Sequence, residues 1–183
     1  MKKLIFLLIV CLSCVFVLYA TDVDYSKLTK AQKKAIEKRN KEIRDSLDHE
    51  SAVEALAKGY YVLMADRIMI KGRSFISIDP NKNFILIQGD NAVIQLAANN
   101  GRPGLNGLGG ITVEGKIGGV RGGKPDKKGR VSYDLNVIGS AVSAQIQITL
   151  YKESCKAVAI VSPNFGSSNL TVYGSIVPYY RVE

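Results

Sequence analysis

The sequence predicts a mainly β domain, an antiparallel meander that forms a sandwich or a closed barrel, with an N-terminal amphipathic helix. Two observations lead to this class. Short runs rich in β-branched and aromatic residues follow one another from Tyr60 onward, and Gly, Asp, Asn and Pro separate them. Helical patterns are missing between these runs, so neighbouring strands must pair antiparallel. We expect a signal peptide over residues 1–20, a basic helical segment over 21–58 and an antiparallel β-domain over 59–183.

The first residues have the composition of an export signal. Lys2 and Lys3 precede an apolar run over residues 4–18, and the small residue Ala20 closes the segment. The run is shorter than the roughly 20 residues that a membrane-spanning helix needs. We therefore expect cleavage after Ala20 and a periplasmic or secreted product. Cys14 leaves one alternative open, a lipoprotein that is acylated and anchored at that cysteine.

Residues 27–44 form a basic stretch with helical spacing. Eight Lys and Arg residues stand there against Glu37 and Glu42, which gives a net charge of +6 in a chain whose total is +9. Thr29 and Gln32 form a capping box at its start. A solvated helix covering one end of the β-domain explains the pattern, and so does contact with an anionic membrane surface. The lysines expected to make such a contact are Lys33, Lys34 and Lys38. Nucleic acid is not an expected partner of an exported protein.

The remaining elements follow from local signals. Ser51 and Glu54 form a second capping box, and Gly59 is a C-terminal stop. They predict a short second helix, or a kinked continuation of the first, that ends near Lys58. Strands are then expected over residues 60–70, 75–78, 84–87, 92–98, 111–117, 131–137, 142–150, 156–161 and 170–177.

Strict alternation over residues 131–137 and 142–150 predicts which side chains build the core. The side chains expected to face inward are Val131, Tyr133, Leu135, Val137, Ile146 and Ile148. Those expected to face outward are Ser132, Asn136, Gln145 and Gln147.

Residues 99–129 hold eleven of the 17 glycines of the chain. Residues 118–124 fit the frame of a phosphate-binding P-loop, but Pro125 stands where a Ser or Thr must bind Mg²⁺. Residues 104–110 lack the spacing of a dinucleotide-binding loop and lead into a strand. We interpret these glycines as loop residues, where close backbone approach could hold a ligand. The loop residues named as binding candidates are Gly104, Asn106, Gly107 and Gly110.

Few residues are suited to catalysis. His49 is the single histidine, Cys155 follows a turn before a strand, and the spacing of a metal site is absent, so we expect neither metal nor cofactor. Asp66 is less ordinary, because it alternates in phase with apolar residues of its strand. Unless a bulge resets that phase, it points toward them, and we interpret it as half of an ion pair with a cation such as Arg67 or Arg73. Asp66 and Arg67 are the remaining binding candidates.

Several strings of the β region, taken together, resemble a family of exported bacterial proteins, the domain of unknown function numbered 4251 (DUF4251). The resemblance covers roughly residues 52–178. The strings that carry it are residues 62–67, 81–84, 103–113, 148–152 and 162–165. It implies a Gram-negative envelope or secreted setting and a compact β-rich fold. It implies neither an activity nor a catalytic motif.

Three classes of function remain. The first is a non-enzymatic envelope protein that binds a small ligand or a partner through the sheet or its glycine loops. The second is a structural or assembly factor of the envelope, which one large apolar surface patch would favour. The third is a hydrolase that uses carboxylates such as Asp66 and Glu114, which requires two acids to converge in a cleft.

Overall fold

The computed structural model describes residues 28–70, 75–97, 110–140, 142–164 and 169–179. Within these ranges the chain forms one helix and nine strands. They are α2 (Lys30–Lys58), β1 (Tyr60–Ile70), β2 (Ile76–Ser77), β3 (Phe84–Gln88), β4 (Asn91–Ala97), β5 (Gly110–Pro125), β6 (Val131–Gly139), β7 (Ala144–Leu150), β8 (Lys156–Pro163) and β9 (Leu170–Pro178). The chain divides into two compact units, residues 1–41 and residues 42–183.

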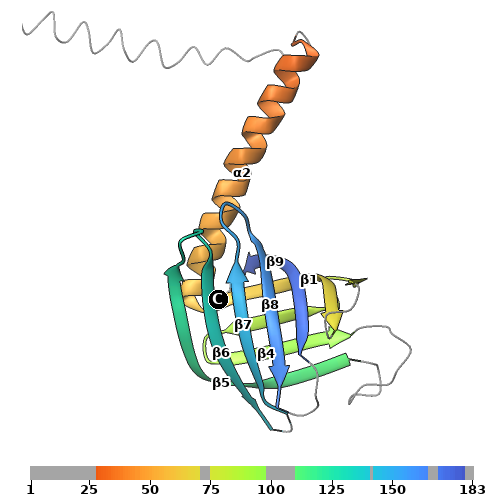
Figure 1. The fold of residues 1–183 in the computed structure, drawn as a ribbon, viewed down its shortest axis with the longest axis vertical. Helices are drawn as coiled ribbons and strands as arrows, with labels where there is room; N and C mark the ends of the chain where they lie inside the picture. Colours follow the sequence, from red (N-terminus) through yellow and green to blue (C-terminus); the bar gives the residue numbers. More distant parts are fainter. Residues whose placement is uncertain (1–27, 71–74, 98–109, 141, 165–168, 180–183) are drawn as a thin grey trace, which may run out of the picture. The chain divides into compact units, whose positions relative to one another are not determined.

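The strands form one antiparallel sheet that closes on itself (Figure 1). Apart from β2, they follow one another around the sheet in chain order, and β1 pairs with β9 to join the two ends. Eight strands therefore make a closed barrel, to which β2 is added. β3 pairs with the first half of β1 and β2 with the second half, so one edge of β1 serves two strands. Of the two architectures expected, the barrel is the one found.

Helix α2 is continuous from Lys30 to Lys58, so the second capping box does not begin a new helix. The first capping box is confirmed: the Thr29 backbone N–H donates to Gln32 Oε1 at 2.9 Å, and the Gln32 N–H donates to Thr29 Oγ1 at 3.3 Å. The described helix is too polar to cross a membrane. The predicted signal segment and its Cys14 alternative lie outside the described residues.

The core lies inside the barrel and is built from side chains of all eight barrel strands. The last turns of α2 add the buried residues Ala52, Ala55 and Leu56 to it. The inward and outward sets predicted for the β6–β7 pair are confirmed, with Tyr133 half-buried against the core. Tyr61 is 2% exposed, and this burial, followed by the neighbouring Tyr133, raises the pKa of its phenol.

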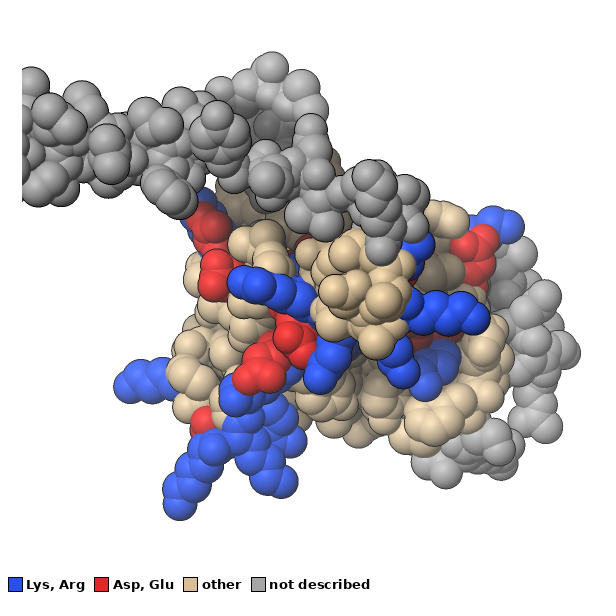
Figure 2. Space-filling model, turned by 90° about the horizontal axis from the view of Figure 1, so that it is seen from above, with Lys and Arg blue, Asp and Glu red and all other residues tan. Residues whose placement is uncertain are grey.

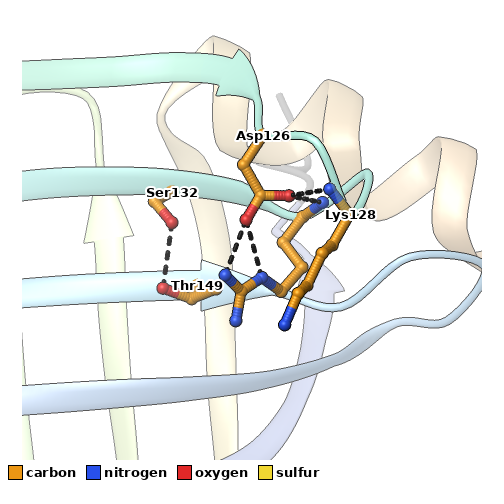
Figure 3. A network of polar contacts seen from close by, with 5 residues as sticks. Asp126, Lys128, Ser132 and Thr149 are labelled. Atoms are coloured by element: carbon orange, nitrogen blue, oxygen red, sulfur yellow. Dashed lines mark hydrogen bonds and ion pairs between the residues drawn. The ribbon is translucent and has the colours of Figure 1, made fainter.

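The β5–β6 connection is fixed by one carboxylate (Figure 3). Asp126 Oδ1 accepts from the backbone N–H groups of Lys128 and Arg130 at 2.8 and 2.9 Å. Its Oδ2 accepts from Arg130 Nε at 2.8 Å. Gly129 completes the turn at φ +72°, a conformation that a side chain disfavours. These donors hold the pKa of the Asp126 carboxyl below its usual value, the Arg130 backbone N–H contributing most.

Residues 118–124, predicted as a loop, belong to β5. The strand keeps its pairing with β6 by shifting register twice, between Ile117 and Gly119 and between Gly122 and Pro125. Glycine allows these irregularities because Gly122 and Gly123 have φ values of +120° and +89°. The many glycines of residues 118–124 therefore belong to an irregular, bent part of β5.

Candidate functional site: an arginine between two rings at a bulge

Strand β1 carries a bulge at Asp66. Its register with β9 shifts between Ala65 and Arg67, which leaves Asp66 as the additional residue. Ala65 and Ile68 both face the core, at 0% and 1% exposure, although an odd number of steps separates them. The backbone carbonyl of Asp66 accepts from the Ile78 N–H at 3.0 Å. The bulge thus presents both Asp66 and Arg67 on the outer face.

The bulge resets the phase of the strand, and Asp66 does not point toward the core. The inward residues of this part of β1 are Tyr61, Leu63 and Ala65, all buried. Val62 and Met64, whose phase Asp66 shares, lie on the outer face and are half-buried. Apolar residues occupy both faces of the strand here, so hydrophobicity alone assigns the wrong one to the core.

Asp66 is paired with two cations. Its Oδ1 lies 3.2 Å from Arg67 Nε, one of the two cations that the sequence indicated. Arg73, the other, lies outside the described residues. Its Oδ2 lies 3.6 Å from Lys156 Nζ on β8. That ammonium also donates to Ser175 Oγ on β9 at 2.9 Å. The charges of these three side chains sum to one positive charge.

The Arg67 guanidinium lies in a corner between two aromatic rings. Its central carbon is 5.7 Å from the ring centroid of Phe75 and 5.6 Å from that of Tyr173. The two rings meet edge to face, with centroids 5.2 Å apart and planes at 76°. We call the group of Asp66, Arg67, Phe75, Lys156 and Tyr173 the Arg67 corner.

The chemistry of the Arg67 corner suits an anion with an apolar body. Cation–π contacts and the bond from Nε hold the guanidinium in place. Within the described residues its terminal N–H groups donate to no protein acceptor, and the side chain is 52% exposed. A guanidinium presented in this way can bind a carboxylate or phosphate through two parallel hydrogen bonds. Phe75, at 54% exposure, offers apolar surface beside it.

The two carboxylates named for a hydrolase do not converge. Asp66 lies on β1 and Glu114 on β5, and β3 and β4 stand between these strands. Three strand spacings correspond to about 14 Å. Carboxylate pairs that hydrolyse glycosides are about 5 to 9.5 Å apart. This pair therefore cannot act together on one bond.

The other residues singled out in the sequence lie apart from this site. Gly104, Asn106 and Gly107 are outside the described residues, and Gly110 is the first residue of β5, paired with Ala97. His49 lies within α2, and its Nδ1 is 2.9 Å from the Ser154 carbonyl oxygen. Cys155 is half-buried against the core. In the described parts of the chain, acids, His and Cys form no cluster that could hold a metal ion.

Three members of the Arg67 corner escaped sequence reasoning. Phe75, Lys156 and Tyr173 belong to segments predicted as strands. Lys156 and Tyr173 are far from Arg67 in the sequence, and Phe75 belongs to the next predicted strand. They meet because β1 pairs with β2 on one edge and with β9 on the other. Barrel closure brings Tyr173 and Lys156 to Arg67, whereas the pairing of β1 with β2 brings Phe75. Neither arrangement is visible as a local pattern in a single sequence.

The basic charge of the protein is mixed with acidic side chains on its surface. Figure 2 shows Lys and Arg side chains interspersed with Asp and Glu on the face it presents. Several of the pairs are short, such as Lys58 with Glu54 at 2.6 Å and Lys152 with Glu153 at 2.7 Å. A net charge of +9 therefore does not by itself define a binding site.

Comparison with known proteins identifies the family of the chain. A search of curated proteins found no match. The chain is similar to a DUF4251 family protein from Bacteroides eggerthii DSM 20697, known from a crystal structure, with 32% sequence identity and a TM-score of 0.66. The similarity covers 75% of this chain and 91% of that one. The profile of the domain of unknown function DUF4251 matches residues 44–176. The chain belongs to the DUF4251 family.

Proposed function

We propose that this protein is an exported, non-enzymatic binding domain, and that its Arg67 corner holds an anionic group of a small molecule or an envelope protein. The observation that carries the proposal is the half-exposed guanidinium held between Phe75 and Tyr173. Export rests on the signal-like residues 1–20.

Because the barrel interior is filled with side chains, the outer surface is the place where another molecule can bind. Every barrel strand contributes buried aliphatic side chains to the interior, which Tyr61 also helps to fill. A barrel of eight strands has room for such a core or for one small ligand. Because side chains occupy this space, the outer face is the better candidate for contact with another molecule.

Rigidity favours the Arg67 corner over the many exposed cations of the chain. An isolated surface lysine loses side-chain entropy when it binds, and its contacts contribute little. Arg67 is already positioned by a strand, two rings and Asp66, so less entropy is lost on binding. Lys156 adds a second positive charge near the same point.

Phenyl phosphate tests the proposal, because it combines an anionic group with an aromatic ring. We expect saturable binding, detected by NMR, with a Kd in the millimolar range. Inorganic phosphate should bind more weakly, and phenol, which lacks the charge, should bind least.

Two variants with the same change in charge show whether phenyl phosphate binds at Arg67. Arg67→Gln should weaken phenyl phosphate binding about tenfold or more, since both charge and bidentate geometry are lost. Lys127→Gln changes the net charge equally in the exposed β5–β6 turn and should leave the affinity unchanged. Equal losses in both variants would attribute the binding to overall charge and refute the proposed site.

The basic part of α2 supports a second contact, with an anionic membrane surface. Lys34 and Lys38 are exposed and Lys33 is half-buried, in a stretch with a net charge of +6 over residues 27–44. Reversal of these three lysines to Glu should abolish co-sedimentation with phosphatidylglycerol vesicles at low salt. Arg67→Gln should leave that co-sedimentation unchanged. Persistence of binding in the triple variant would refute the membrane contact.

A further inference from the structure

The outer face of β5–β8 has a hollow that the Arg67 corner does not use. Its volume is about 650 Å³. The floor on the β5 side is formed by Gly118 and Gly119, which lie at the first register shift of that strand. A Cβ added at Gly119 would meet no atom within 4 Å. A Cβ at Gly118 would instead meet the Ile138 side chain at 2.7 Å. The space therefore comes from the missing side chain of Gly119 and from the register shift beside it.

Two rows of side chains cross this hollow in register. One row runs from Arg121 through Asp134 and Gln147 to Ile160, and the other runs from Gly119 through Asn136 and Gln145 to Ser162. The polar residues of both rows on β6 and β7 are exposed, and their neighbours along each strand face the core. The lining of the hollow on β6 and β7 therefore consists of the outward-facing residues of regular, fully paired strands, not of loose strand ends.

The hydrogen-bonding groups of the hollow are only partly used. Gln147 Nε2 donates to Asp134 Oδ1 at 3.0 Å, which fixes one pair. The side chains of Asn136, Gln145 and Arg121 have no hydrogen-bond partner among the described residues. Two carboxamides side by side offer both donors and acceptors.

Two features restrict the ligand. β6 and β7 are paired on both edges, so a peptide cannot bind there by adding a strand. Arg121 and Asp134 balance one another in charge, so the hollow does not favour a strongly charged ligand. Val120 and Ile160, at 55% and 37% exposure, place apolar surface at its rim.

We infer that this hollow is a binding site for a neutral, hydroxyl-rich ligand of the saccharide class. Each sugar hydroxyl both donates and accepts, which matches the carboxamides of Asn136 and Gln145, and the C–H faces of a sugar ring match Val120 and Ile160. The inference is independent of the Arg67 corner, which selects a charged group on other strands.

NMR titration of the isotope-labelled protein tests the inference with a fixed set of probes: maltotetraose, cellotetraose, xylotetraose, mannotetraose and chitotetraose. We expect at least one of them, at about 10 mM, to shift the side-chain amide signals of Asn136 and Gln145 and the backbone amide of Gly119 in a saturable way. Absence of such shifts with all five would overturn the inference. A hexaglutamate peptide that binds the same amides more tightly than every sugar would overturn the ligand class.

Filling the hollow provides the matched control. Gly119→Phe occupies the open space without a strained φ and should weaken the sugar about tenfold or more. Val177→Phe adds the same ring at an exposed position of β9 and should leave the affinity unchanged. If Gly119→Phe fails to fold, the double variant Asn136→Ala, Gln145→Ala tests the same contacts from the exposed side. Undiminished binding in whichever variant folds would overturn the inference.

Discussion

The β6–β7 pair and strand β1 are both walls of the same barrel, yet they differ in regularity. β6 and β7 pair without interruption from Val131↔Leu150 to Val137↔Ala144, and their side chains alternate between core and solvent. β1 breaks this alternation at Asp66 and divides one edge between two partner strands. The regular pair mainly supplies core, whereas the break in β1 turns two charged residues outward beside two rings. Irregular backbone is thus where this barrel places its most distinctive chemistry.

The largest effect is expected in the regular pair. Ile146→Ala should lower the free energy of unfolding by about 2 to 5 kcal/mol, because it removes buried apolar surface and leaves a cavity. Gln145→Ala, one residue away on the outer face, should cost less than about 0.5 kcal/mol. Urea unfolding of the two variants measures the difference. Equal costs would show that the two faces of β7 are not distinguished as described.

The next effect concerns the partner of the bulge. A Cβ on Gly174 of β9 would collide with the backbone carbonyl oxygen of Met64, just before Asp66. Gly174→Ala should therefore cost about 1 to 3 kcal/mol of the free energy of unfolding. Gly119→Ala is the matched control, since its Cβ meets open space, and it should be neutral or slightly stabilising. A neutral Gly174→Ala would mean that β1 and β9 are not so closely apposed at the bulge.

A smaller, pH-dependent effect is expected at the turn that leads into β6. The fold lowers the pKa of the Asp126 carboxyl, so its stabilising contribution is complete above the unfolded-state pKa of about 4 and is lost as the pH falls through the folded pKa. Asp126→Asn should be less stable than the wild type at neutral pH, and the gap should narrow in acid. Urea unfolding from pH 7 to pH 2 measures it. A constant gap would contradict the assigned role of the carboxylate charge.

The sequence predicts the regular pair β6–β7 better than the irregular strand β1. Alternation over residues 131–137 and 142–150 contains apolar residues on one face only, so the core of β6 and β7 is predicted correctly. β1 has Val62 and Met64 on its outer face, and hydrophobicity alone cannot show that these face outward. The capping box at Thr29 is local and is confirmed.

The site is less accessible to such reasoning than the fold. The Asp66–Arg67 ion pair is local and was expected. Phe75 reaches it through the β1–β2 pairing, and Tyr173 and Lys156 reach it through the β1–β9 pairing that closes the barrel. The second half of β5 was predicted as a loop because its glycines are typical of loops. Contacts set by closure and by bulges depend on the three-dimensional pairing of strands, which residue periods do not specify.

We expect the outward guanidinium of Arg67 to bind an anionic ligand while contributing little to stability. The Arg67 Nε–H signal, followed by NMR during titration with phenyl phosphate, tests this expectation most directly. We expect this signal to shift in a saturable way together with the ring signals of Phe75 and Tyr173, while Arg67→Gln costs under about 0.5 kcal/mol of the free energy of unfolding. An unchanged Arg67 signal while those of other arginines shift, or a large loss of stability in Arg67→Gln, would show that Arg67 does not bind the ligand in the proposed way.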